Sequence, residues 1–178
     1  MDAELERILA DDYLDGLGTR PVAELRELRA ECQAVETQVS YLRRMVQGRH
    51  DIVGGEMERR TKGGDPHDVA DLVERLPEIL ADRIHAPGPG RLPTGSPGEL
   101  TGQMADRLAE ITAQVPIESP GDADDAALAR VSGELEDLER QVSAVRRQLF
   151  DRIDALQGEI TRRYRDGEAN VNDLLTGG

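Results

Sequence analysis

Aromatic residues are scarce in this sequence of 178 residues, which has no Trp, one Phe and three Tyr. A thick globular core normally contains several aromatic side chains, so we expect a thin seam of aliphatic side chains instead. Basic residues are also fewer than acidic ones, with 22 Lys and Arg against 36 Asp and Glu. The resulting net charge of −14 excludes a generally basic nucleic-acid-binding protein. The acidic surface either keeps the protein soluble or meets a partner with a basic face.

Cysteines and long apolar runs are nearly absent as well. The one cysteine, Cys32, excludes an internal disulfide, and nothing else indicates secretion. The sequence contains no run of about 18 apolar residues, the length that a membrane-spanning helix needs. The N-terminus is acidic and amphipathic, whereas a leader peptide is basic and then apolar. We therefore expect a cytoplasmic protein that does not enter membranes.

Helical patterns separated by Pro and Gly divide the chain into segments. We expect a short N-terminal helix in 1–18, a first long helix in 19–62, an amphipathic helix in 63–86, a Pro/Gly-rich linker with a short helix in 87–123, a second long helix in 124–166 and a C-terminal tail in 167–178. The N-terminal helix should cover 2–14, and the short helix within the linker 99–115. Thr19 is expected to cap the first long helix, with Pro21 in its first turn.

Both long helices carry apolar residues at alternating spacings of three and four. In the first helix these are Leu25, Leu28, Cys32, Val35, Val39, Leu42, Val46, Val53 and Met57, and in the second they are Leu128, Val131, Leu135, Leu138, Val142, Val145, Leu149, Leu156 and Ile160. This spacing is the heptad pattern of a coiled coil. No alternating strand pattern occurs, so we predict an all-α fold in which the two long helices pair within one chain as an antiparallel coiled coil.

The two long helices also repeat their polar residues. A shift of 103 positions places "ETQVSYLRRMVQGRHDIVGGEMERR", which starts at Glu36, over "ERQVSAVRRQLFDRIDALQGEITRR", which starts at Glu139. Glu, Gln-Val-Ser, Arg-Arg, Arg, Asp, Gly-Glu and Arg-Arg coincide. A shared heptad explains matching apolar residues, but it does not explain matching Ser, Arg and Asp.

Five of these positions in each helix form a narrow band that we call the polar stripe. Its members are Glu36, Ser40, Arg43, Gln47 and Asp51 in the first helix, and Glu139, Ser143, Arg146, Phe150 and Asp154 in the second. At about 100° per residue, each set spans roughly 80° beside the apolar seam. The structural alternative is that such flanking positions are charged in most coiled coils and only form salt bridges between the helices.

Two equivalent sets of polar groups suit a planar, anionic ligand with two-fold symmetry. Arg43 and Arg146 are suited to bind phosphates or stack on purines, and a carboxylate such as Asp51 or Asp154 matches the N1 and N2 donors of guanine. Ser40, Ser143 and Gln47 supply short polar contacts, while Glu36 and Glu139 are placed to hold the arginines. The further arginines expected beside the stripe are Arg44, Arg49, Arg147 and Arg152.

The stripe resembles the RsiG anti-sigma factors, in which each of two coiled-coil helices carries Glu-xxx-Ser-xx-Arg-xxx-Gln-xxx-Asp. The first helix matches throughout, and the second departs from the pattern at Phe150, where Gln is usual. The resemblance implies that a stacked dimer of cyclic di-GMP binds the coiled coil, at the stripe residues together with Arg44 and Arg147. It also implies that the loaded protein, a monomer alone, forms a heterodimer with a flagellar-type sigma factor that controls sporulation genes. That sigma factor is then kept from RNA polymerase and promoter DNA, without direct nucleic-acid binding by this chain.

No pattern in the sequence indicates an enzyme or a metal site. His50, His67 and His85 lack the spacing of metal ligands, and no nucleophile, base and orienting residue form a recognisable catalytic motif. Cys32 occupies a seam position and is expected to be a buried small hydrophobe. The alternatives that remain are a coiled-coil scaffold or adaptor without a ligand and a homodimeric coiled coil.

Overall fold

The computed structural model describes residues 2–63 and 102–167, which form helices and no strand. In chain order the elements are α1 (Asp2–Leu9), α2 (Val22–Thr61), α4 (Gln103–Gln114), the 3₁₀ turn η1 (Pro120–Asp122) and α5 (Asp125–Arg165). The all-α prediction is confirmed, and both long helices begin and end close to the expected residues. The amphipathic helix predicted in 63–86, most of the linker and the C-terminal tail lie outside the described residues.

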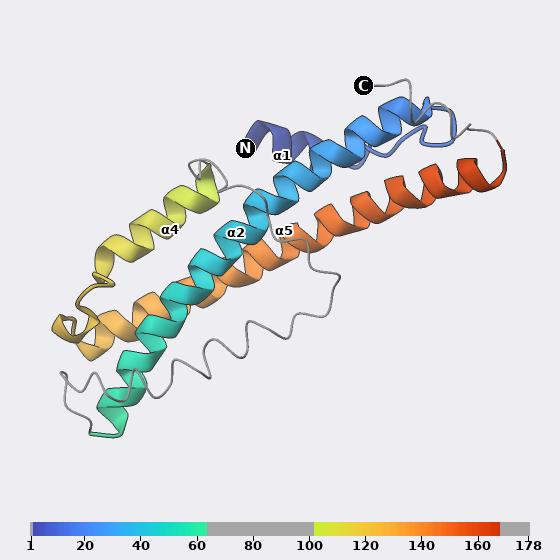
Figure 1. The fold of residues 1–178 in the computed structure, drawn as a ribbon. Helices are drawn as coiled ribbons and strands as arrows, with labels where there is room; N and C mark the ends of the chain where they lie inside the picture. Colours follow the sequence, from blue (N-terminus) through green and yellow to red (C-terminus); the bar gives the residue numbers. More distant parts are fainter. Residues whose placement is uncertain (1, 64–101, 168–178) are drawn as a thin grey trace.

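The long helices α2 and α5 pack along each other in opposite directions (Figure 1). Near one end of the pair, Arg60 of α2 contacts Asp125 at the start of α5, with 2.6 Å between nitrogen and oxygen. Near the other end, Arg26 of α2 donates a hydrogen bond to Tyr164 at the end of α5. The expected intramolecular, antiparallel coiled coil is therefore confirmed.

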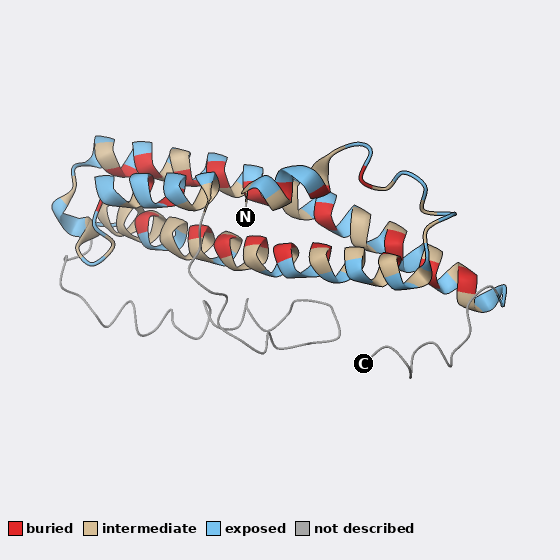
Figure 2. Cartoon of the chain, turned by 90° about the horizontal axis from the view of Figure 1, so that it is seen from above, coloured by how far each residue is buried: buried red, intermediate tan, exposed pale blue. Residues whose placement is uncertain are grey.

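The seam between α2 and α5 consists of the predicted heptad residues. Its fully buried members are Leu25, Cys32, Val35, Val39, Leu42 and Val46 from α2 and Leu128, Leu135, Leu138, Val142, Leu149 and Leu156 from α5. Leu28 and Val145 are only partly buried against them. Buried residues recur at regular intervals along the long helices in Figure 2. Burying one such aliphatic side chain stabilises the fold by about 1.5–3 kcal/mol, so the seam is the main stabilising element.

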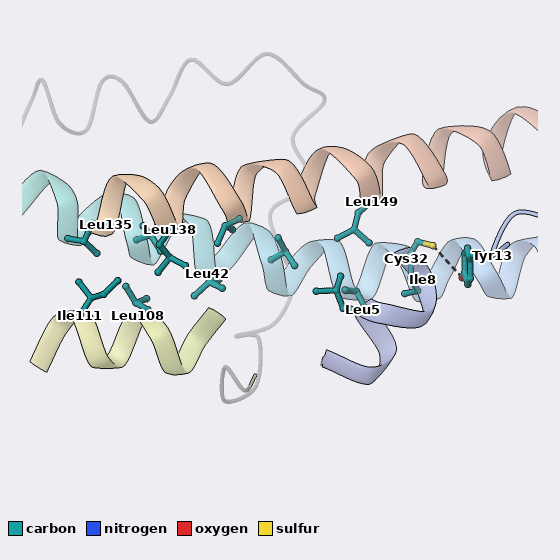
Figure 3. Packing of buried hydrophobic residues seen from close by; sticks show 14 of the residues in the cluster. Leu5, Ile8, Tyr13, Cys32, Leu42, Leu108, Ile111, Leu135, Leu138 and Leu149 are labelled. Carbon is teal, nitrogen blue, oxygen red and sulfur yellow. Dashed lines mark hydrogen bonds between the residues drawn. The ribbon is translucent and has the colours of Figure 1, made fainter. Parts of the chain in front are cut away.

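Helices α1 and α4 lie on the same side of the α2–α5 pair, each over one half of it (Figures 1 and 3). Leu5 and Ile8 of α1 and Leu108 and Ile111 of α4 are buried against the long helices. The shift of 103 positions that relates the long helices also places Leu5 on Leu108 and Ile8 on Ile111. The internal repeat thus includes the short helices, which sequence reasoning missed because only two apolar positions carry it.

Helix α1 ends at Leu9, earlier than the predicted residue 14. Arg152 of α5 donates hydrogen bonds to the carbonyl oxygens of Ile8, Leu9 and Ala10, so the carbonyls at the end of α1 are satisfied without a further helical turn. The chain then turns and places Tyr13 in the core, where its hydroxyl donates to Glu31 at 3.1 Å.

Cys32 lies fully buried next to Tyr13, and its thiol donates to the Tyr13 hydroxyl at 3.5 Å (Figure 3). Burial raises the pKa of the Cys32 thiol above its ordinary value, and burial likewise raises the pKa of the Tyr13 hydroxyl. A raised thiol pKa disfavours the reactive thiolate. The interpretation of Cys32 as a small hydrophobe of the seam agrees with this environment.

The predicted cap of the first long helix is wrong. Thr19 donates its hydroxyl to the carbonyl of Gly16 at 3.0 Å, and Pro21 occupies the capping position of α2 without a side-chain hydrogen bond. Gly16 adopts φ +70°, so the chain reverses there and the Thr19 side chain faces back into the turn. In contrast, α5 has a side-chain cap, because Asp124 accepts a hydrogen bond from the backbone of Ala127 at 2.7 Å.

The repeated Gly-Glu-xx-Arg-Arg at the end of each long helix forms a connection that we call the arginine clasp. In α2, Glu56 holds Arg59 and Arg60, and Arg60 also donates to the carbonyls of Gly121 and Ala123 at 3.0 and 2.7 Å. These carbonyls belong to the turn that leads into α5.

In α5, Glu159 holds Arg162 and Arg163 in the same way. Arg163 donates to the carbonyls of Leu17 and Arg20, in the turn that leads into α2. The clasps therefore fasten the end of each long helix to the start of the other, which gives this part of the repeat a structural role.

Acid should weaken both clasps. Hydrogen bonds from Arg59 and then Arg60 lower the pKa of Glu56 from 4.5 to about 2, and those from Arg162 and then Arg163 lower the pKa of Glu159 equally. Carboxyl groups with lowered folded-state pKa values stabilise the fold above pH 4.5 and lose this contribution as the pH falls toward 2. Between these values the melting temperature of the wild type should fall more steeply than that of the Glu56→Gln/Glu159→Gln variant.

Circular dichroism melts at several pH values measure both slopes. Glu6→Gln, at an exposed position of α1, is the control and should keep the wild-type slope. Equal slopes for the wild type and the double variant would contradict the structural role of the clasps.

Candidate functional site

The antiparallel pairing brings the two halves of the polar stripe into contact at the middle of the coiled coil. Arg43 of α2 donates its Nε hydrogen to Glu139 Oε1 and to Ser143 Oγ of α5, both at 2.9 Å. Ser143 in turn donates to Glu139 Oε1 at 2.9 Å. An arginine of one helix is thus held by the glutamate and serine of the other.

The same cluster occurs a second time with the helices exchanged. Arg146 of α5 donates its Nε hydrogen to Glu36 Oε1 at 3.1 Å and to Ser40 Oγ at 2.8 Å on α2. Ser40 also donates to Glu36. The two Glu–Ser–Arg clusters are therefore related by a pseudo-two-fold axis that crosses the coiled coil between them.

Both clusters leave part of each guanidinium available. In the described part of the chain, the two terminal nitrogens of Arg43 and of Arg146 make no hydrogen bond, because the glutamate and serine take only the Nε hydrogen. The side chains of Arg43 and Arg146 are 32% and 36% exposed. A guanidinium fixed on one edge and open on the other is well suited to receive an anion.

The clusters lie on the side of the coiled coil that α1 and α4 leave open. Residues of α1 and its turn bind Glu31, and Arg107 and Gln114 of α4 bind Glu134. Glu31 and Glu134 each precede a seam residue by one position, whereas the stripe residues follow one. At about 100° per residue these positions fall on opposite sides of the seam. No helix among residues 2–63 and 102–167 covers the stripe.

The axial spacing of the groups follows from the register. Arg146 contacts both Glu36 and Ser40 and so lies between them, and the step from the midpoint of these two residues to Arg43 along α2 corresponds to about 7 Å at about 1.5 Å per residue. The two arginine positions are therefore separated by about 7 Å along the coil axis. Asp51 follows Arg43 by about 12 Å, and Asp154 lies equally far beyond Arg146 in the other direction.

A family model for RsiG-like proteins matches residues 11–80 and 115–177 of this sequence. The chain belongs to the RsiG-like family. Membership of this family implies the role of an anti-sigma factor, a regulator that is not an enzyme. No curated protein matches the sequence. Within the described residues, no helix is both long enough and apolar enough to cross a membrane.

The residue next to each Glu–Ser–Arg cluster differs between the two halves of the stripe in this RsiG-like protein. Gln47 donates to Glu139 Oε1 at 3.4 Å and so extends the Arg43 cluster. At the equivalent position of α5, Phe150 packs against Arg146, whose guanidinium carbon lies 4.7 Å from the ring centroid. The structure therefore brings together all stripe residues except the two aspartates, but with one polar and one aromatic half.

The remaining predicted site residues lie around this centre. Asp51 and Asp154 are exposed and make no hydrogen bond or ion pair with any other described residue. Arg44 and Arg147 are exposed at the edge of the stripe, and the Arg44 guanidinium lies 6.0 Å from the ring of Tyr41. These four side chains are unengaged or weakly engaged by the described residues, which leaves them accessible to solvent or to a ligand.

Arg49 and Arg152, expected beside the stripe, belong to the opposite face of the RsiG-like coiled coil. Arg152 binds the carbonyls at the end of α1, and Arg49 donates to the carbonyl of Met45 within its own helix at 3.3 Å. Both positions precede a seam position by one residue, which turns them toward the short helices. The expectation that Arg49 and Arg152 lie beside the stripe was therefore wrong, because they are on the face that the short helices cover.

The histidines and other potential metal ligands of the described residues do not gather into one site. No group of three or more His, Cys, Asp or Glu side chains there could hold a metal ion. His50 lies in the seam region, 3.3 Å from Ser132 Oγ across the helices. His67 and His85 lie outside the described residues.

Proposed function

We propose that this protein is an anti-sigma factor that binds cyclic di-GMP on the polar stripe and, so loaded, sequesters a sigma factor of the flagellar or sporulation type. The observation that carries this proposal is the pair of reciprocal Glu–Ser–Arg clusters, which present two equivalent, partly exposed guanidinium groups on the face that α1 and α4 do not cover. Simple charge pairing between helices explains the Glu–Arg contacts. It does not explain a serine at the same place in both clusters or the unused guanidinium edges.

Cyclic di-GMP matches the two-fold arrangement of the site. Its ring contains two phosphodiesters and two guanosines related by two-fold symmetry, so each half of the ligand can meet one half of the stripe. Arg43 and Arg146 would bind phosphates or guanine edges through their free terminal nitrogens. A stacked dimer of the nucleotide would fill the distance between the two arginine positions, and no metal is needed to neutralise its charge.

The outer ends of the site suit guanine. A carboxylate can accept hydrogen bonds from guanine N1 and N2 at once, and Asp51 and Asp154 stand about 12 Å beyond the arginines without a side-chain partner among residues 2–63 and 102–167. Arg44 and Arg147 would add positive charge near the phosphates. Glu36, Glu139, Ser40 and Ser143 would act by holding the arginines in place, which lowers the entropic cost of binding.

Binding across both helices would link the ligand to the coiled coil as a whole. Each arginine is held by groups of the opposite helix, so a bound nucleotide stabilises the paired state of α2 and α5. A ligand at 100 times its dissociation constant stabilises the folded state by about 2.7 kcal/mol. The loaded coiled coil would then offer the sigma factor one rigid surface formed by protein and nucleotide.

The partner surface is expected to be basic. Sigma factors bind DNA, and a chain with a net charge of −14 favours association with a basic partner electrostatically. Covering the DNA- and polymerase-binding surfaces of the sigma factor would keep it from promoters, and this requires no contact between the anti-sigma factor and nucleic acid. The expected complex is a heterodimer, with the anti-sigma factor monomeric when alone.

Calorimetric titration of the purified protein with cyclic di-GMP, with and without a flagellar-type sigma factor, tests the proposal. Saturable binding of the nucleotide and tighter sigma-factor binding in its presence are expected. Asp51→Ala and Asp154→Ala should each weaken nucleotide binding by about tenfold, because each removes a charged hydrogen-bond acceptor. Asp106→Ala, an exposed aspartate on α4, is the matched control and should leave the affinity unchanged.

The alternative is a coiled-coil scaffold or adaptor whose arms carry the repeat without a ligand. Cross-helix pairing of arginine and glutamate favours it, since this pairing is common in coiled coils. That function predicts no heat of binding and no shift of the melting temperature with cyclic di-GMP, so the same titration distinguishes the two.

A further inference from the structure

The two halves of the stripe are chemically unequal although the helices that carry them repeat. On the Arg43 side, Gln47 adds a hydrogen bond to the cluster. On the Arg146 side, the equivalent residue is Phe150, which cannot donate a hydrogen bond to Glu36 as Gln47 does to Glu139. A strictly two-fold ligand would therefore meet two different environments.

Phe150 is also an unusual surface residue in its own right. It is 37% exposed, and in the described part of the chain only Ile52 joins it as an exposed large apolar side chain. The seam residue Leu149 beside it is fully buried, so Phe150 is not needed to close the core. Part of the Phe150 ring is therefore accessible beside the stripe, where a planar ligand can reach it.

The neighbour of the ring is the arginine of the second cluster. The Arg146 guanidinium carbon lies 4.7 Å from the centroid of Phe150, within the range of a cation–π contact. Glu36 and Ser40 hold Arg146 from the other helix, so ring and guanidinium form one firmly supported apolar and cationic surface. Nucleobases stack on surfaces of this kind, which combine an aromatic ring with a guanidinium group.

We propose that Phe150 is a stacking platform for a guanine base of the nucleotide, and that the Arg146 half of the site binds its base by stacking while the Arg43 half uses hydrogen bonds. This inference rests on the proposed binding of cyclic di-GMP. It assigns Phe150 a binding role in place of the hydrogen bond that glutamine would make. The two halves of the ligand are then held by different forces in the same site.

The single phenylalanine allows a direct test. Fluorophenylalanine incorporated into the full chain labels residue 150 alone, since the sequence contains one Phe. Addition of cyclic di-GMP should shift the ¹⁹F resonance through the ring current of the stacked base. In calorimetry, Phe150→Ala and Phe150→Leu should each weaken nucleotide binding by about tenfold, the usual effect of removing one base–aromatic stack.

Leu replaces the ring by an apolar side chain without a π face and so separates stacking from simple apolar cover. Tyr41→Leu is the matched control, because it removes another ring near an arginine at a position about 120° around α2 from the centre of the stripe. This variant should bind as the wild type does. Melting temperatures should change little in all three variants, since none removes a fully buried side chain.

The outcomes separate this inference from the proposed function. If the wild type binds cyclic di-GMP but both Phe150 variants bind equally well and the ¹⁹F resonance does not move, the stacking role is wrong and the proposed function stands. If Phe150→Leu binds as tightly as the wild type and only Phe150→Ala binds more weakly, residue 150 makes an apolar contact rather than a stack. This result would also overturn the inference. Absence of binding to the wild type would overturn the proposed function and this inference together.

Discussion

Replacing Arg43 and Arg146 together by alanine is expected to weaken cyclic di-GMP binding by about 100-fold or more while the coiled coil stays folded. Hydrogen bonds to charged groups contribute about 1.5–3 kcal/mol each, and both halves of the ligand would lose theirs. The Arg43–Glu139 pair is partly exposed, and pairs of this kind add about 0–1 kcal/mol to stability. Calorimetry gives the affinity and circular dichroism the helix content.

Two further variants sharpen this experiment. Arg107→Ala removes an arginine from the opposite face, where it pairs with Glu134, and should leave nucleotide binding unchanged. The exchange Arg43→Glu/Glu139→Arg keeps an ion pair between the helices but moves the guanidinium to the other arm. It should retain the melting temperature and lose affinity. Unchanged affinity in the double alanine variant would show that the nucleotide binds elsewhere and that the polar stripe is not its site.

Replacing Leu42 or Leu149 by alanine should destabilise the protein by about 2–5 kcal/mol, the range measured when buried leucines are truncated. Both side chains are fully buried in the seam between α2 and α5. A small domain is stable by only about 5–15 kcal/mol, so either variant should lose a large part of its stability. Urea unfolding followed by circular dichroism measures the change.

Leu28→Ala is the control for this second experiment, because Leu28 is only partly buried and its truncation should destabilise the protein less. Since each Glu–Ser–Arg cluster combines residues of both long helices, nucleotide binding should fail in parallel with unfolding of the coiled coil. Unfolding midpoints for Leu42→Ala and Leu149→Ala equal to that of Leu28→Ala would show that the seam does not dominate stability.

Much of the fold could be predicted because it depends on local patterns. Alternating spacings of three and four apolar residues predicted the buried seam of both long helices, and the turn residues placed their ends to within a few positions. The repeat of Glu, Ser, Arg and Asp predicted which polar residues belong together, and the resemblance to RsiG anti-sigma factors agrees with the family match. The predicted helix cap at Thr19 and the predicted end of α1 were wrong, since both depend on contacts with the rest of the fold.

The polar partners could not be predicted in the same way. From the sequence alone, Arg60 and Arg163 are ordinary helix arginines and Arg152 is expected beside the stripe, yet the structure places each on carbonyl groups of another segment. Contacts of this kind depend on loops that return to the helix from distant parts of the chain. Sequence periodicity contains no information about such contacts.

By itself, the sequence determined that two amphipathic helices with matching polar residues are present and that each must bury its seam. Only the tertiary structure decided how these residues meet, because a heptad seam can pair in either direction and at several registers. The antiparallel register places Glu36 and Ser40 opposite Arg146, and Glu139 and Ser143 opposite Arg43. Helices α1 and α4 pack on the other face, so no helix among the described residues covers these clusters. The site therefore arises from long-range packing, while its chemistry is written in the local repeat.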